Sequence, residues 1–326
     1  MRGVTAEHQP AATRRRDVVP AARYLGVAVL VAAGLAAPFM VYPVFLMNAL
    51  CFALFACAFN LLLGYVGLLS FGHAMFFGWA AYVAAHAAKV WGIPPLLSIL
   101  AGTAVAGVMG VAFGWLAIRR AGIYFAMVTL AFAQMMYFFA LQAPFTGGED
   151  GIQAVPRGSL FGVVNLAHPL GMYYFVLAVF VVGFLLIWRT VNSPFGEVLK
   201  AIRENEPRAI SLGYKVELYK LLAFVMSAAL AGLAGATKAL VFQFATLTDV
   251  HWHTSGTVVL MTLLGGMGTI FGPVVGAFVV VSLQNYLAQF GGWVTVITGA
   301  IFVVCVLLFR RGIVGELAYR LKLRGA

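Results

Sequence analysis

The chain has 326 residues with a mean hydropathy of +0.98, and 63% of its residues are hydrophobic while 10% are charged. A soluble globular protein is about half apolar and about a quarter charged, so this composition excludes a water-soluble fold. The net charge of +11 indicates orientation in a lipid bilayer rather than a nucleic-acid partner, because the Lys and Arg residues cluster beside apolar runs.

The apolar runs are long and continuous, which predicts an all-α, polytopic integral membrane protein rather than a barrel of alternating strands. A basic tail over 1–22 includes Arg14, Arg15 and Arg16 and precedes no cleavable apolar segment, so we expect it to stay in the cytoplasm. A helix needs about 20 apolar residues to cross the membrane. The candidate spans within a membrane domain over 23–310 are 24–42, 44–63, 67–88, 94–118, 122–141, 171–189, 219–241 and 292–309, with a ninth apolar region over 254–290.

The distribution of charge predicts which side each loop occupies. With the N-terminus inside, the fourth span ends inside at Arg119 and Arg120, and the acidic loop 146–151 lies outside. The sixth span then returns inside at Arg189, where a mixed-charge loop rich in Lys and Arg begins over 190–218. This order agrees with the excess of basic residues that membrane proteins keep in their cytoplasmic loops.

The apolar region 254–290 decides the number of crossings. The C-terminal tail, 311–326, is basic and should lie inside, which requires 254–290 to cross twice with an inside turn at 265–273. The piece 254–264 is too short to span alone, so we expect a half-helix completed by irregular backbone that protein or a water-filled cavity covers. The prediction is about ten crossings with both termini cytoplasmic.

Two glycine-containing segments resemble each other: "LLGYVGLLSFG" at 62–72 and "LLGGMGTIFGP" at 263–273. Both begin L-L-G-x-x-G and continue to Phe-Gly, with an offset of one residue. Paired interrupted segments in two halves are typical of transporters built from internal repeats, although Leu and Gly are common enough here for a chance match. The glycines either allow close helix packing or line a translocation path. The candidates for such a path are Gly64, Gly67, Ser70, Gly72, His73, Gln134, Gly265 and Gly268, and His73 can equally be a hydrogen-bonded structural residue.

The acidic residues argue against an ion-coupled carrier, which usually keeps an ionisable group inside the bundle. All ten fall in tails, loops or the extreme ends of spans: Glu7, Asp17, Glu149, Asp150, Glu197, Glu204, Glu206, Glu217, Asp249 and Glu316. No nucleotide-binding, zinc-protease or serine-hydrolase motif occurs, and the three cysteines lack metal-ligand spacing. We therefore expect no catalytic, cofactor or metal site, and energy supplied by a partner that presses on the cytoplasmic surface.

The loop 190–218 has the features of a surface that could receive such a partner. Ser193 and Pro194 predict a helix start, and an apolar stripe follows at Phe195, Val198, Leu199 and Ile202. Pro207 ends this helix and can begin another, which Gly213 stops. A short helix held at a bend between two spans can be pushed as a unit, although a solvated linker would have the same composition.

The segment "AIRENEPRAISLGYKVELYKLLAF" at 201–224 resembles the coupling motif E-A-A-x-x-x-G of ABC importer permeases. Ala209 and Gly213 match the motif, whereas Pro207 and Arg208 depart from it and Glu206 is displaced by one residue. Further blocks occur in family order, and over about residues 25–310 the chain resembles the LivM-type permease subunit of branched-chain amino acid importers. These blocks are "NLLLGYVGLLSFGHAMFFGWAAY", "GIYFAMVTLAFAQM", "TGGEDGI" and "LLGGMGTIFGPVVGA".

The resemblance implies a complex in the bacterial inner membrane. Its other members would be a LivH-like permease, two ABC ATPase subunits that bind ATP-Mg, and a periplasmic solute-binding protein. The implied coupling residues are Arg203, Glu204, Glu206, Ala209 and Gly213. The implied substrates are leucine, isoleucine and valine, although similar permeases carry urea, short amides or other amino acids. Further polar candidates for the path are Thr129, Tyr124, Gln243 and Lys238, and we expect Lys238 to extend to the membrane interface rather than to meet a substrate carboxylate.

Overall fold

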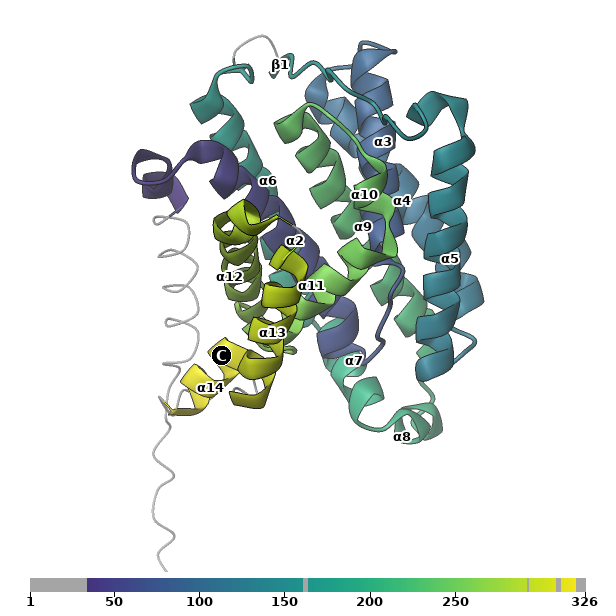
Figure 1. The fold of residues 1–326 in the computed structure, drawn as a ribbon. Helices are drawn as coiled ribbons and strands as arrows, with labels where there is room; N and C mark the ends of the chain where they lie inside the picture. Colours follow the sequence, from purple (N-terminus) through teal and green to yellow (C-terminus); the bar gives the residue numbers. More distant parts are fainter. Residues whose placement is uncertain (1–33, 161–163, 292, 309–311, 321–326) are drawn as a thin grey trace, which may run out of the picture.

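The computed structural model describes residues 34–160, 164–291, 293–308 and 312–320, which form a bundle of helices (Figure 1). The predicted tail 1–22 and most of the first predicted span, 24–42, lie outside the described residues, as do residues 309–311 and 321–326.

Five of the described helices are long and apolar enough to cross a membrane. They are α2 (Pro43–Tyr65), α4 (Pro95–Ala117), α5 (Ile123–Gln142), α6 (Pro169–Val191) and α9 (Val216–Phe242). Shorter helices complete the bundle: α3 (His73–Lys89), α11 (Trp252–Gly265), α12 (Gly272–Leu287) and α13 (Trp293–Leu308). A proline in the first turn begins α2, α4, α6 and α12, where its missing N–H costs nothing and its φ already suits a helix.

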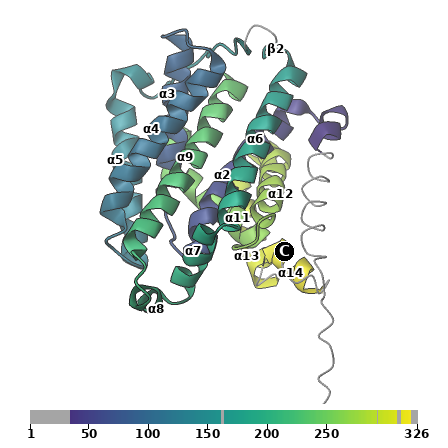
Figure 2. The ribbon, with the colours of Figure 1, turned by 180° about the vertical axis from the view of Figure 1, so that it is seen from behind.

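Short elements connect or flank these helices. They are η1 (Ala37–Phe39), η2 (Pro144–Thr146), η3 (Ala288–Phe290), α7 (Pro194–Glu204), α8 (Glu206–Ser211), α10 (Leu247–Val250), α14 (Gly312–Arg320), β1 (Ser159–Leu160) and β2 (Val164–Asn165). β1 and β2 form an antiparallel pair at one end, and α7 and α8 lie at the other (Figures 1 and 2). We call the end that carries α7 and α8 the basic end.

Helix α2 lies at the centre of the fold. It packs against α6, α9 and α12, and 83% of its apolar window is buried, against 28% for α4 and for α5. A helix that is hydrophobic on every side belongs in the interior of a bundle, which agrees with this position. In contrast, α5 stands at the edge of the bundle (Figure 1) and leaves large apolar side chains such as Met127 and Phe138 exposed.

The predicted continuous span over 67–88 is wrong at its start. Helix α2 ends at Tyr65, irregular backbone follows over 66–72, and α3 begins only at His73. The φ of Gly67 is +82°, which a right-handed helix cannot contain. The helix therefore breaks inside the first glycine-containing segment.

The second glycine-containing segment also breaks a helix, and here the predicted turn over 265–273 is close to the observed one. Helix α11 ends at Gly265, and α12 begins at Gly272. The φ of Gly268 is +78°, and Gly268 holds the same place in L-L-G-x-x-G that Gly67 holds in the other segment. The two segments thus use a left-handed glycine at matching positions.

Candidate functional site

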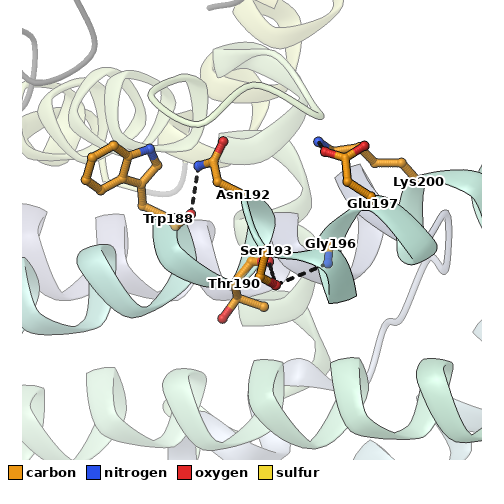
Figure 3. Close-up of polar contacts among 7 residues, drawn as sticks. All are labelled: Trp188, Thr190, Asn192, Ser193, Gly196, Glu197 and Lys200. Atoms are coloured by element: carbon orange, nitrogen blue, oxygen red, sulfur yellow. Dashed lines mark hydrogen bonds and ion pairs between the residues drawn. The ribbon is translucent and has the colours of Figure 1, made fainter. Parts of the chain in front are cut away.

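A tight bend joins α6 to α7 at the basic end (Figure 3). The Ser193 hydroxyl donates to the Thr190 carbonyl at 2.7 Å and accepts from the Gly196 N–H at 3.4 Å, so it caps α7. The Asn192 side chain donates to the Trp188 carbonyl at 2.8 Å. The two bonds of Ser193 connect the last turn of α6 to the first turn of α7 and so fix the bend between the two helices.

Helix α7 has the predicted amphipathic form. The apolar side chains of the stripe turn toward the bundle, and Leu199 and Ile202 are buried. Glu197 and Lys200 lie on the outer face, where their charged groups pair at 2.9 Å (Figure 3). An exposed pair of this kind contributes little to stability, so the apolar stripe is what holds α7 against the bundle.

Helix α8 is fixed at both ends. Asn205 caps its start by accepting from the Arg208 N–H at 3.0 Å, and Gly213, with a φ of +86°, forms the predicted left-handed stop. The buried Ala209 packs with Ile202 and Val216. The Glu206 carboxylate pairs with the ammonium of Lys220 on α9 at 2.6 Å. Helices α7, α8 and the start of α9 therefore form one supported unit.

The turn after α8 presents an apolar surface to the outside. Ile210 is 57% exposed, Leu212 69% and Tyr214 40%, and we call these three residues the α8 patch. Exposed Arg208 and Lys215 flank the α8 patch, which lies at the tip of the basic end (Figure 1). Exposed apolar side chains that cluster among charged ones mark an interaction surface, for a protein partner or for the membrane.

The two helix breaks meet each other beside α7. The Asn60 side chain of α2 accepts from the Gly268 N–H at 2.9 Å and donates to the Thr269 carbonyl at 2.9 Å. One guanidinium nitrogen of Arg203 donates to the Gly64 carbonyl. Arg203 and its neighbour Glu204 are both exposed at the end of α7, and the Arg203 guanidinium extends from there to the Gly64 carbonyl.

Asn60 is the functional candidate that the sequence reasoning missed. Its side chain is 2% exposed and lies four residues before Gly64 in an otherwise apolar run. An amide inside an apolar run needs hydrogen-bond partners for both its oxygen and its nitrogen. An isolated Asn in such a run therefore predicts a contact with polar backbone elsewhere in the fold.

His73 is enclosed within the protein. Its Nε2 lies 2.9 Å from the Ser227 hydroxyl, which itself donates to the Ala58 carbonyl at 2.5 Å. The Ser227 proton is thus in use, so His73 donates through Nε2. The rings of Phe59 and Phe224 meet the imidazole edge to face, and its other nitrogen has no partner among the described residues.

The Lys238 side chain turns into the protein and forms an ion pair there. Its ammonium pairs with the Asp249 carboxylate, and the side chains are 14% and 7% exposed. It also lies 5.4 Å from the ring of Phe52 and 5.6 Å from the ring of Phe77. Asp249 is buried although it follows the end of a predicted span, because the short α10 packs against α3. At this contact, a Cβ on Gly78 would lie 2.7 Å from the backbone nitrogen of Val250.

Comparison with known proteins identifies the family. The family described as branched-chain amino acid transport system, permease component, matches residues 41–309. The chain belongs to this permease family.

The relatives of this permease are importer subunits. It is 28% identical over 293 residues to the high-affinity branched-chain amino acid transport system permease protein LivM of Escherichia coli (strain K12), covering 81% of this chain and 68% of LivM. The autoinducer 2 import system permease protein LsrC of Salmonella typhimurium is 30% identical over 150 residues, 44% of this chain and 42% of LsrC. The ribose import permease protein RbsC of Bacillus subtilis (strain 168) is 29% identical over 196 residues, 55% of this chain and 58% of RbsC. None of the solved structures matches the chain significantly.

Two of the remaining polar candidates, Ser70 and Thr129, hold the backbone just before α3. Ser70 is buried and accepts from the Gly72 N–H at 3.2 Å, and the Thr129 hydroxyl accepts from the Phe71 N–H at 3.2 Å. Gln134 is half-buried on α5, and Tyr124 is exposed near the start of the same helix.

Gln243 supports a different part of the permease. It ends α9 with a φ of +61° and donates to the Val155 carbonyl at 3.3 Å, which holds a loop at the end opposite to the basic end. Among the described residues, no three His, Cys, Asp or Glu side chains gather where they could hold a metal ion.

Proposed function

We propose that this permease is the membrane-spanning subunit of an ATP-driven importer. Separate ATPase subunits bind the α8 patch, and a second permease subunit completes the translocation path. The observation that carries the proposal is the exposed apolar surface of Ile210, Leu212 and Tyr214 on a unit that is tied to both α6 and α9. A partner that moves this unit moves two long helices of the bundle together.

The proposed topology has about ten crossings, with both termini in the cytoplasm. It is supported by the basic end, which brings together α7, α8 and the start of α14. A Cβ on Gly312, at the start of α14, would collide with Gly266 in the turn between α11 and α12. The C-terminal helix therefore lies on the side that carries the loop 190–218, as the charge distribution predicts. The left-handed Gly67 and Gly268 at matching positions favour the proposed two-half repeat.

The proposed substrates are leucine, isoleucine and valine, which a periplasmic solute-binding protein delivers. The similarity to LivM extends over more of the chain than the similarity to LsrC or RbsC. A permease for urea, short amides or other amino acids is the second candidate, because relatives named for other cargo, LsrC and RbsC, also match part of the chain. Binding measurements on the partner solute-binding protein decide between these substrate classes.

The first prediction tests the α8 patch. Replacing Ile210 and Leu212 together with Asp should abolish ATP-driven leucine uptake in proteoliposomes that contain the full complex, because buried carboxylates would oppose docking of the ATPase. The variant should still insert into the membrane, and the ATPase should no longer co-purify with it. The control is Glu197→Ala, which alters an exposed pair and should keep uptake. Normal uptake by the double variant would refute the docking role of the α8 patch.

The second prediction tests the source of energy. The chain alone in liposomes should not accumulate leucine under a proton or sodium gradient, since the buried acid of the described structure, Asp249, is already paired with Lys238. Radiolabelled leucine accumulation measures this directly, and vesicles with the complete complex and ATP serve as the positive control. Gradient-driven accumulation by the isolated chain would make it an ion-coupled carrier.

A further inference from the structure

We propose that Arg203 is a positioning residue that links α7 to both helix breaks, so that a push on the α8 patch moves the two breaks as one body. The inference rests on the proposed ATP-driven function. It goes beyond that function by naming the side-chain contact that passes a movement of α7 and α8 to the transmembrane helices.

Arg203 lies in the last turn of α7 and touches three glycines of the two breaks. Its guanidinium donates to the Gly64 carbonyl at the end of α2. A Cβ on Gly67 would lie 3.1 Å from Arg203 Cγ, and a Cβ on Gly268 would lie 3.2 Å from its Nη1. One side chain of the coupling unit therefore contacts both the break after α2 and the turn between α11 and α12.

The two breaks are joined to each other independently of Arg203. Asn60 bonds a backbone donor and a backbone acceptor of the 266–271 turn, both at 2.9 Å. A Cβ on Gly64 would lie 2.6 Å from the Gly268 backbone nitrogen, so this approach requires glycine. The end of α2 and the turn are consequently one unit, and Arg203 is placed to move it.

The charge of Arg203 suits this position. The Gly64 carbonyl is one of the last carbonyls of α2, where the helix dipole is negative and the ladder of intrahelical bonds ends. The last carbonyls of a helix need partners outside the helix, and the Arg203 guanidinium provides one at Gly64.

Lys200 provides a matched control on the same helix. It carries the same charge one turn earlier, but its ammonium pairs with Glu197 on the outer face. If only positive charge at the surface of α7 mattered, substituting Lys200 or Arg203 would impair transport equally. If Arg203 links α7 to the breaks, only the substitution of Arg203 should impair transport.

The experiment uses the complete complex with its ATPases and solute-binding protein in proteoliposomes. Leucine uptake and ATP hydrolysis are measured in the same vesicles for Arg203→Met, Arg203→Lys, Gly64→Ala and Lys200→Met. We expect Arg203→Met and Gly64→Ala to hydrolyse ATP at close to the wild-type rate, while uptake per ATP hydrolysed falls by about tenfold. Arg203→Lys should recover part of the loss, and Lys200→Met should behave as wild type. Loss of ATPase binding in Arg203→Met, or equal effects of Arg203→Met and Lys200→Met, would overturn the proposal.

A distance measurement separates this proposal from the function on which it rests. Spin labels on cysteines at Glu197 and Met267, with the three native cysteines replaced by alanine, report on α7 and on the turn. Both positions are exposed. In the wild-type background the distance should stay constant between nucleotide-free and ATP-bound states, and in Arg203→Met it should change between them. A distance that behaves identically in the two backgrounds would overturn the link even if uptake is normal. Absence of leucine uptake in the wild type would instead refute the proposed function.

Discussion

Replacing Lys238 with Met should destabilise the folded protein by about 3–5 kcal/mol, because it leaves the Asp249 carboxylate buried without its partner. The two side chains are 14% and 7% exposed, so water cannot take the place of the ammonium. Methionine keeps the apolar stem that packs against the rings of Phe52 and Phe77. Denaturant unfolding of the purified chain in detergent measures the loss.

The double variant Lys238→Met with Asp249→Leu is the matched control. It removes both charges, and it should be more stable than the single Lys238→Met variant, since an apolar pair of similar volume can replace a buried ion pair. If the two substitutions lower the free energy of unfolding additively, so that the double variant is less stable than Lys238→Met, the result would contradict the pairing. So would a Lys238→Met variant whose stability equals that of the wild type.

The second large effect is expected at Gly276 on α12. A Cβ at this position would overlap the Met261 carbonyl oxygen of α11, which is backbone and cannot rotate away. The Gly276→Ala variant must therefore push α11 and α12 apart. We expect a loss at or above the upper end of the range of about 1–3 kcal/mol that overpacking costs.

The control for this prediction is Gly256→Ala on the neighbouring helix α11. No atom lies within 4 Å of the Cβ that this substitution adds. Alanine also forms helices better than glycine by up to about 1 kcal/mol, so this variant should be neutral or slightly stabilising. The same detergent unfolding assay compares the two. Equal stability of Gly276→Ala and Gly256→Ala would show that the close approach of α11 and α12 does not hold in solution.

The predicted helices and their observed bounds agree best where the signal is local. The expected spans 94–118 and 122–141 are close to α4 and α5, because continuous apolar runs with clear ends define them. In the loop 190–218, Ser193 and Gly213 predicted the start of α7 and the stop after α8 correctly. Caps and left-handed glycines act within a few residues, so the sequence contains all the information that they need.

The sequence does not reveal contacts whose partners are distant in the chain. The pairing of Lys238 with Asp249 depends on how α10 folds against α3, and no pattern of spacing contains this information. The bond from Arg203 to the Gly64 carbonyl joins residues that lie 139 positions apart. The ATPase-contact role of Arg203, Glu204 and Glu206 stays a prediction.

The sequence by itself determined the class of protein, the approximate bounds of most long helices, and the break between α11 and α12. These properties follow from composition, charge and short-range backbone preferences, which act independently of the rest of the fold. Only the tertiary structure decided which buried polar groups meet: Asn60 with the 266–271 turn, Arg203 with Gly64, and Lys238 with Asp249. The physical reason is that a buried polar group must find a partner wherever packing places one, and packing is a property of the whole bundle.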